Sequence, residues 1–235
     1  MEPIVETLEV KGLSITLTRK AVKNAHLSVH PPDGRISLVA PIGTRTAVAN
    51  SFILTKIAWI KQQQEELARQ ERETPRENIA RESHYLWGKR YLLQVREADE
   101  KPHVYYDHKN LILTVRPEAT AEKRAEVMYE WYKGLLHEAI PPLIFKWEKQ
   151  LQVSVEAYFL QKMKTKWGSC NYKKRHIRIN TELVKKPKDL LEYIIVHEMA
   201  HLIVSNHSEE FIQILDQHYP NWRDARKELN DLPIT

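Results

Sequence analysis

Polar and apolar residues alternate through most of the first forty positions of the chain. Residues 13–19 and 25–29 show this two-residue period, which places every second side chain on the same face of a strand. Residues 35–39 alternate as well, and they follow Pro31-Pro-Asp-Gly34, a sequence typical of a turn between strands. The pattern predicts an antiparallel β-meander over residues 4–40.

The period then changes to that of a helix. Between about Arg45 and Arg72, apolar residues recur at steps of three and four, which puts them on one helical face. These residues are Val48, Phe52, Ile53, Ile57, Ile60 and Leu67. The polar second half of this helix is interpreted as solvated, and the segment from Pro75 to Ser83 as a linker.

Both periods recur through the rest of the chain. The elements that they predict are strands at 91–96 and 111–115, a helix at 119–151, strands at 153–160 and 175–180, a helix from Pro187 to about Ser205, and a last helical stretch after Ser208. Pro141 and Pro142 lie inside the 119–151 stretch. Because proline lacks an N–H and clashes with the preceding turn, we expect this pair to end one helix and to start the next.

The composition is that of a globular protein, with 42% hydrophobic and 29% charged residues among 235. No apolar run reaches about 18 residues, the length that a membrane helix needs. Residues 1–6 lack the basic and apolar pattern of a secretory signal. A single cysteine, Cys170, excludes an internal disulfide. We therefore expect a cytoplasmic protein with no membrane segment.

The net charge of +5 is compatible with an anionic partner such as a nucleic acid. The basic residues are mixed with acidic ones along the chain, which favours a solvated surface instead. One basic cluster lies beside Trp167 and Tyr172 and consists of Lys162, Lys164, Lys166, Lys173, Lys174 and Arg175. Basic side chains interleaved with aromatic rings can bind phosphates or stacked bases. A solvated face is the favoured interpretation, and nucleotide or nucleic-acid binding is the alternative.

The strongest chemical motif is His197-Glu198-Met199-Ala200-His201. Side chains four residues apart lie one turn above each other on a helix, so both imidazoles can reach one metal ion. Catalytic zinc is held by three protein ligands and keeps one position for water. Glu198 lies about 100° round the helix from His197, where its carboxylate can take a proton from that water. The motif predicts a zinc-dependent hydrolase with Glu198 as its catalytic base.

The third metal ligand is expected just after the motif. His207 follows His201 by six residues, so an unbroken helix would turn it away from the metal. A bend near Ser205-Asn206 would bring it back, and asparagine tolerates the left-handed conformation that such a bend can need. Glu209 and Glu210 are the alternative ligands, because some zinc sites combine two histidines with a glutamate.

The helix that carries the motif is apolar on nearly all sides, which predicts that it is buried. Its apolar residues are Leu190, Leu191, Ile194, Ile195, Val196, Leu202, Ile203 and Val204. Two histidines and a glutamate on a buried helix are costly unless they have partners, and a metal ion would supply one. A chance match of the five-residue pattern is the alternative, and a third histidine on such a helix argues against it.

Four further residues are expected to bind the substrate. Trp167, Gly168 and Ser169 precede the predicted strand at 175–180, and a strand beside the motif helix can pair with an extended peptide through main-chain hydrogen bonds. Tyr219 follows the third ligand, and a tyrosine near the metal can stabilise an oxyanion. A structural turn around the tryptophan and packing at a helix end are the alternatives. The lone cysteine is interpreted as an inert core residue.

Three segments of the sequence resemble the YgjP-like metallopeptidases, which are relatives of the SprT-like proteins. They are Lys162–Cys170, Ile194–Leu202 and Asn206–Phe211, with weaker similarity through the N-terminal strands and Trp87–Tyr91. The resemblance implies a zincin-type site with His197, His201 and His207 as zinc ligands and Glu198 as the catalytic base. It also implies a β-rich N-terminal region ahead of the metallopeptidase core.

The expected fold is therefore α+β. A β-rich module with a long helix occupies residues 1–80, and a zincin-like metallohydrolase domain with the HExxH helix occupies residues 81–235. The expected reaction is hydrolysis of a peptide or protein by zinc-bound water that Glu198 activates. One alternative is a metal-dependent nucleoside triphosphate pyrophosphatase, which would cleave a nucleotide phosphoanhydride. The other is a nucleic-acid-associated, SprT-like protein whose protease activity is conditional or absent.

Overall fold

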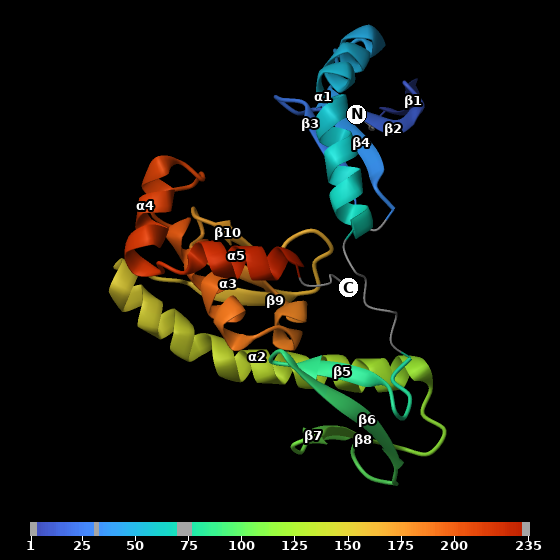
Figure 1. Cartoon of the computed structure of the whole chain (residues 1–235), viewed down its shortest axis with the longest axis vertical. Helices are drawn as coiled ribbons and strands as arrows, with labels where there is room; N and C mark the ends of the chain where they lie inside the picture. The colour runs from blue at the N-terminus through green and yellow to red at the C-terminus, as the bar shows by residue number, and fades with distance from the viewer. Residues whose placement is uncertain (1–3, 31–32, 70–76, 232–235) are drawn as a thin grey trace. The chain divides into compact units, whose positions relative to one another are not determined.

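The computed structural model describes residues 4–30, 33–69 and 77–231, and the chain divides between residues 72 and 73 into two units (Figure 1). Each unit has its own hydrophobic core. Helices and strands are both abundant, so the fold is of the mixed α+β class that the sequence predicts. Within the described ranges, no helix combines the length and the apolar composition that crossing a membrane requires.

The first unit contains a four-stranded sheet. Its strands are β1 (Ile4–Val10), β2 (Leu13–Lys20), β3 (His26–His30) and β4 (Arg35–Pro41), in the order β1-β2-β4-β3. The predicted antiparallel meander is wrong, because β2 and β4 pair in parallel, with Ile15 opposite Ile36. These two central strands carry the fully buried Leu17 and Leu38, because a strand in the middle of the sheet buries its apolar side chains best. Strand β3 is half-exposed and lies at an edge of the sheet.

Helix α1 (Thr46–Arg69) packs against this sheet. Of the predicted face, Ile53 and Ile60 are buried in the core of the first unit and Phe52 packs against it. Ala49, which the prediction did not include, is buried as well. Val48, which was assigned to the same face, is instead 58% exposed.

The second unit contains two sheets. The first has strands β5 (Ser83–Leu86), β6 (Lys89–Glu97), β7 (His103–Tyr106) and β8 (Asn110–Val115), in the order β5-β6-β8-β7. The second has strands β9 (Ala157–Gln161), β10 (Gly168–Asn171) and β11 (His176–Asn180), in the order β10-β11-β9. Among the described strands β10 pairs with β11 alone, so it forms one edge of its sheet.

Helix α2 (Ala121–Leu151) connects the two sheets and runs without a break, as Figure 1 shows. The prediction that Pro141 and Pro142 end one helix and start another is therefore wrong. A proline inside a helix costs about 3 kcal/mol. Here both prolines face solvent, while Leu136, Ile140 and Ile144 continue one buried stripe past them. Burying each such side chain contributes about 1.5–3 kcal/mol, which offsets the lost backbone hydrogen bonds.

The chain ends in a 3₁₀ turn and three helices. These are η1 (Thr181–Lys185), α3 (Lys188–Ala200), α4 (Glu209–His218) and α5 (Trp222–Asp231). Helix α3 contacts α2, α4, α5, β10 and β11, so it is enclosed on nearly all sides, as its apolar sequence predicts. It ends at Ala200, five residues earlier than the predicted Ser205.

Replacing Ile53 with alanine should destabilise the first unit by about 2–5 kcal/mol, because it leaves a cavity at a fully buried position. Hydrogen exchange followed by mass spectrometry should show faster exchange in β1–β4 and α1 and unchanged exchange in α3, since the two cores are separate. Val48→Ala on the same helix is the control and should change little. Equal acceleration in α3 would contradict the separation of the cores.

Candidate metal centre

His197 and Glu198 lie in the last turn of α3, and His201 is the residue that caps the helix. The backbone of His201 is still helical, with φ −67° and ψ −13°, so the four-residue spacing holds to the end. The rings of His197 and His201 are 5.1 Å apart between centroids. The two motif histidines therefore face the same point, as predicted.

The chain reverses direction between α3 and α4 and brings His207 back to the motif. Nε2 of His207 lies 3.1 Å from Nε2 of His197. The bend begins where α3 ends, because the N–H groups of Ile203 and Val204 both donate to the carbonyl of Ala200. The expected left-handed asparagine is not used: Asn206 has no positive φ, and its side chain instead accepts a hydrogen bond from the backbone N–H of Ser208.

Three imidazoles thus converge on one point. A ligand nitrogen from each of His197, His201 and His207 lies within 4.8 Å of the other two. Within the described ranges, this group contains neither Glu209 nor Glu210, the alternative ligands, which lie in the first turn of α4. The spacing suits three ligands around a single ion.

Phe211 packs against all three rings. Its centroid lies 5.1 Å from that of His197, 4.5 Å from that of His201 and 4.8 Å from that of His207. Phe211 is almost fully buried, so it forms a rigid wall behind the imidazoles. The sequence shows it only as an apolar residue on α4, four positions after His207, and nothing in that pattern predicts contact with the histidines.

The protonation states of the histidines fit metal binding. Burial, together with the neighbouring His201 and His207, lowers the pKa of His197 to about 3. Burial also lowers the pKa of His201. Both rings are therefore neutral near pH 7, as metal ligands must be. Nδ1 of His201 lies 3.1 Å from the carbonyl oxygen of Val204, which can only accept, so this nitrogen donates and Nε2 is left for a metal.

Glu198 points into the same site from a buried position. Burial raises the pKa of its carboxyl to about 8, and the positive charge of Lys166 opposes this rise. A carboxyl in such surroundings is well suited to exchange protons near neutral pH. Any cation bound by the three histidines would also favour its ionised form.

A pocket of about 430 Å³ opens onto these groups and is lined by the three histidines and Glu198. Trp167, Gly168 and Ser169, which were predicted to bind substrate, line it as well. Tyr219 does not: its hydroxyl donates to the carbonyl of Asp189, 3.1 Å away. The structure therefore brings three of the four predicted substrate residues to the pocket.

The model of the YgjP-like family, metallopeptidase domain, matches residues 23–232 of the chain. The chain belongs to the YgjP-like metallopeptidase family. No protein among those with curated functions matches its sequence.

Two crystal structures of metallopeptidase zymogens are similar to part of this YgjP-like chain. Jannalysin of Methanocaldococcus jannaschii is 23% identical, with a TM-score of 0.35, over 39% of this chain and 87% of its own. Abylysin of Pyrococcus abyssi is 17% identical, with a TM-score of 0.36, over 40% of this chain and 97% of its own.

Cys170 also lines the pocket of this YgjP-like protein. Burial and the nearby Glu198 raise the pKa of its thiol to about 11. Because the thiolate is the form that binds metals and reacts as a nucleophile, a protonated thiol supports the interpretation of Cys170 as an inert residue.

Arg226 on α5 is a pocket residue that the sequence analysis missed. Its positive charge opposes protonation of His197. The segment after Tyr219 was predicted only as a helical stretch, and a charged residue there looks like part of a solvated face. Contact between α5 and α3 brings it to the site, and that packing is not visible in the local pattern.

Gly168 approaches Glu198 so closely that a side chain does not fit. A methyl group at this position would lie 2.6 Å from Oε1 and 2.7 Å from Cγ of Glu198. Gly168→Ala should therefore destabilise the protein by about 1–3 kcal/mol through overpacking. In a Glu198→Ala background the cost should largely disappear, because the clashing atoms are gone.

Thermal unfolding of the wild type, both single variants and the double variant measures this coupling. Gly134→Ala in α2 is the control, because it adds a methyl group in open space and should cost nothing. An equal cost of Gly168→Ala in both backgrounds would show that Glu198 is not what excludes the methyl group.

Proposed function

We propose that this protein is a zinc-dependent peptidase in which His197, His201 and His207 bind the metal. The observation that carries the proposal is the convergence of these three imidazoles, within 4.8 Å, beside the buried carboxyl of Glu198. Membership in a metallopeptidase family supports the same reaction class. Three neutral nitrogen ligands are a common donor set for catalytic zinc.

Glu198 is assigned the proton transfers. When bound, the zinc ion would polarise the attacking water and the carbonyl of the scissile bond. The carboxylate of Glu198 accepts a proton from that water and then delivers it to the leaving amine. Its buried position excludes bulk water from these transfers, and the hydrogen bond from His201 to Val204 keeps one ligand ring oriented.

Strand β10 is the proposed docking edge for the peptide. One edge of β10 pairs with β11, with Ser169 opposite Arg178. An extended peptide can pair with the opposite, outer edge of β10 through main-chain hydrogen bonds. Because Gly168 touches Glu198, a peptide on this edge would lie beside the catalytic carboxylate.

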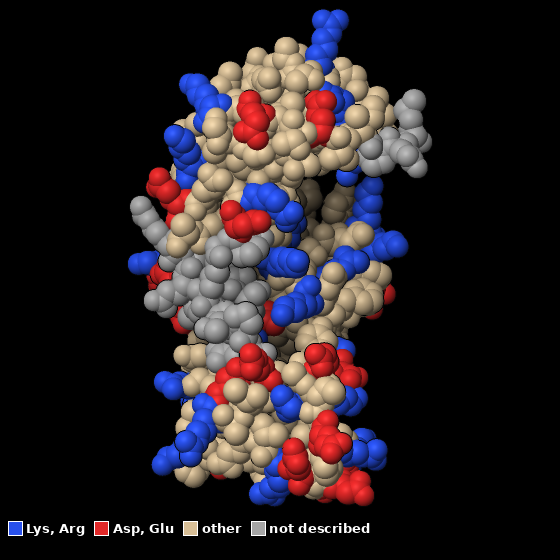
Figure 2. Space-filling model, turned by 90° about the vertical axis from the view of Figure 1, so that its right-hand side faces the viewer, with Lys and Arg blue, Asp and Glu red and all other residues tan. Residues whose placement is uncertain are grey.

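The alternative functions receive no comparable support. Of the six residues in the basic cluster, Lys166 is the one that lines the pocket. Lys162 instead faces Glu182, and Arg175 donates to the carbonyl of Ser154. The cluster therefore does not form a phosphate cradle at the candidate metal centre. On the face drawn in Figure 2, acidic side chains lie among the basic ones, unlike the uniformly basic surface expected of a nucleic-acid-binding protein.

His201→Ala should abolish stoichiometric zinc binding, because it removes one of three ligands and leaves the site open. Glu198→Gln should keep the zinc and lower peptidase activity about 10²–10⁴-fold, because the amide cannot accept the proton. Elemental analysis of the purified proteins and cleavage of unfolded casein measure the two effects. His176→Ala, which changes a histidine outside the group of three, is the control and should keep both zinc and activity.

Full activity of Glu198→Gln, or full zinc occupancy in His201→Ala, would contradict the proposed roles. Release of phosphate or diphosphate from a nucleotide panel, with casein left intact, would favour the phosphoanhydride hydrolase instead.

A further inference from the structure

Two exposed cationic side chains, Lys166 and Arg226, line the pocket that contains Glu198. Among the described lining residues Glu198 is the one carboxylate, and it is buried beside the histidines. The ion pairs found in the described part of the chain include neither cation, whereas Lys162 and Arg223 nearby both face acidic partners. Among the described lining residues, an anion that enters the pocket would therefore meet two cations and no exposed acidic group.

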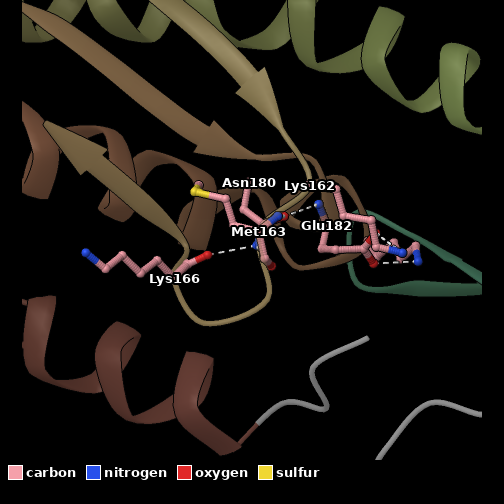
Figure 3. Close-up of polar contacts among 6 residues, drawn as sticks. Lys162, Met163, Lys166, Asn180 and Glu182 are labelled. Atoms are coloured by element: carbon pink, nitrogen blue, oxygen red, sulfur yellow. Dashed lines mark hydrogen bonds and ion pairs between the residues drawn. The ribbon is translucent and has the colours of Figure 1, made fainter. Parts of the chain in front are cut away.

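The backbone around Lys166 is fixed by Asn180. The buried side-chain amide of Asn180 donates to the carbonyl oxygens of Met163 and Lys166, each at 2.8 Å. Figure 3 shows the Asn180 side chain between these residues. Its Oδ1 accepts from the backbone N–H of Glu182 at 3.1 Å. The side chain of Lys162 turns toward Glu182, whereas that of Lys166 extends in the opposite direction (Figure 3). Lys162 is thus paired with Glu182, whereas Lys166 lines the pocket.

Arg226 reaches the pocket from another element. Helix α5 buries Trp222, Ala225 and Leu229 on its inner face, which fixes the helix and places Arg226 beside the site. Arg226 lines the pocket together with Tyr193 and His197 of α3. Two independently anchored elements therefore bring positive charge to one pocket.

We propose that Lys166 and Arg226 bind a carboxylate of the peptide substrate close to the scissile bond. The site would accordingly prefer a peptide with an acidic side chain, or a free C-terminal carboxylate, near the bond to be cleaved. This proposal rests on the proposed peptidase function and specifies its substrate class.

The chemistry of the two cations fits a carboxylate. Arginine offers a planar fork of N–H donors that matches the two carboxylate oxygens, and lysine adds a mobile point charge. Among the described residues, neither side chain has an ion pair to break before it binds. Both are exposed at the pocket wall and not buried beside the histidines. This position suits a group that flanks the scissile bond better than the scissile carbonyl itself.

The activity test uses the zinc-loaded full chain and four short peptides of one sequence. They carry glutamate or glutamine at the positions flanking the cleaved bond, and a free or amidated C-terminus. Wild-type kcat/KM should be about tenfold higher or more for the carboxylate that is recognised. If the glutamate and glutamine peptides differ by this ratio, the recognised carboxylate is a side chain. If the free and amidated peptides differ, it is the C-terminal carboxylate. Lys166→Gln and Arg226→Gln should each reduce the ratio, and Lys164→Gln and Lys227→Gln, on the same elements outside the pocket lining, should keep it.

A binding test separates this proposal from the peptidase function. Zinc-free wild type should bind the acidic peptide more tightly than its neutral counterpart by calorimetry, and the difference should shrink with added salt and in Arg226→Gln. This result would support carboxylate recognition even if no peptide were cleaved. Equal binding and equal kcat/KM for all four peptides in the wild type would overturn it. An equal loss of kcat for acidic and neutral peptides in Arg226→Gln would overturn it as well, because that pattern belongs to oxyanion stabilisation.

Discussion

The burial of helix α3 is the constraint on which the rest of the structure depends. Its apolar residues bury most of the last helical turn, including Glu198, and leave His197 partly buried. Desolvation keeps the imidazole neutral and the carboxyl partly protonated, since a low dielectric disfavours charge on either group. A cation bound by the three imidazoles would reverse this preference for the carboxyl, because a nearby positive charge favours the ionised form. The same packing that stabilises the second unit therefore prepares the site for a metal.

The elements packed around this helix determine the shape of the candidate site. Strand β10 can approach because residue 168 is glycine, and α4 returns to the site because the chain turns directly after Ala200. Phe211 then packs against each of the three imidazoles and restricts how these rings can reorient. Rigid support of this kind keeps ligands at metal-binding distances without requiring the metal to order the chain.

The sequence predicts what depends on local periodicity and fails where packing decides. The four-residue spacing of His197 and His201 is a property of one helix, so it could be read directly. The parallel pairing of β2 with β4 and the continuity of α2 through Pro141 both depend on which apolar faces are buried together. Arg226 lies more than twenty residues from the motif, and only the contact between α5 and α3 brings it to the pocket. No local pattern contains that information.

The candidate metal centre is built from residues of one unit. Every described residue that lines the pocket belongs to the second unit, between Lys166 and Asn230. The first unit has its own hydrophobic core. The family match nevertheless begins at residue 23, so the family is defined by sequence in both units. All four residues to which we assign metal binding and proton transfer belong to the second unit: His197, Glu198, His201 and His207. The family similarity in the first unit therefore concerns residues other than these four.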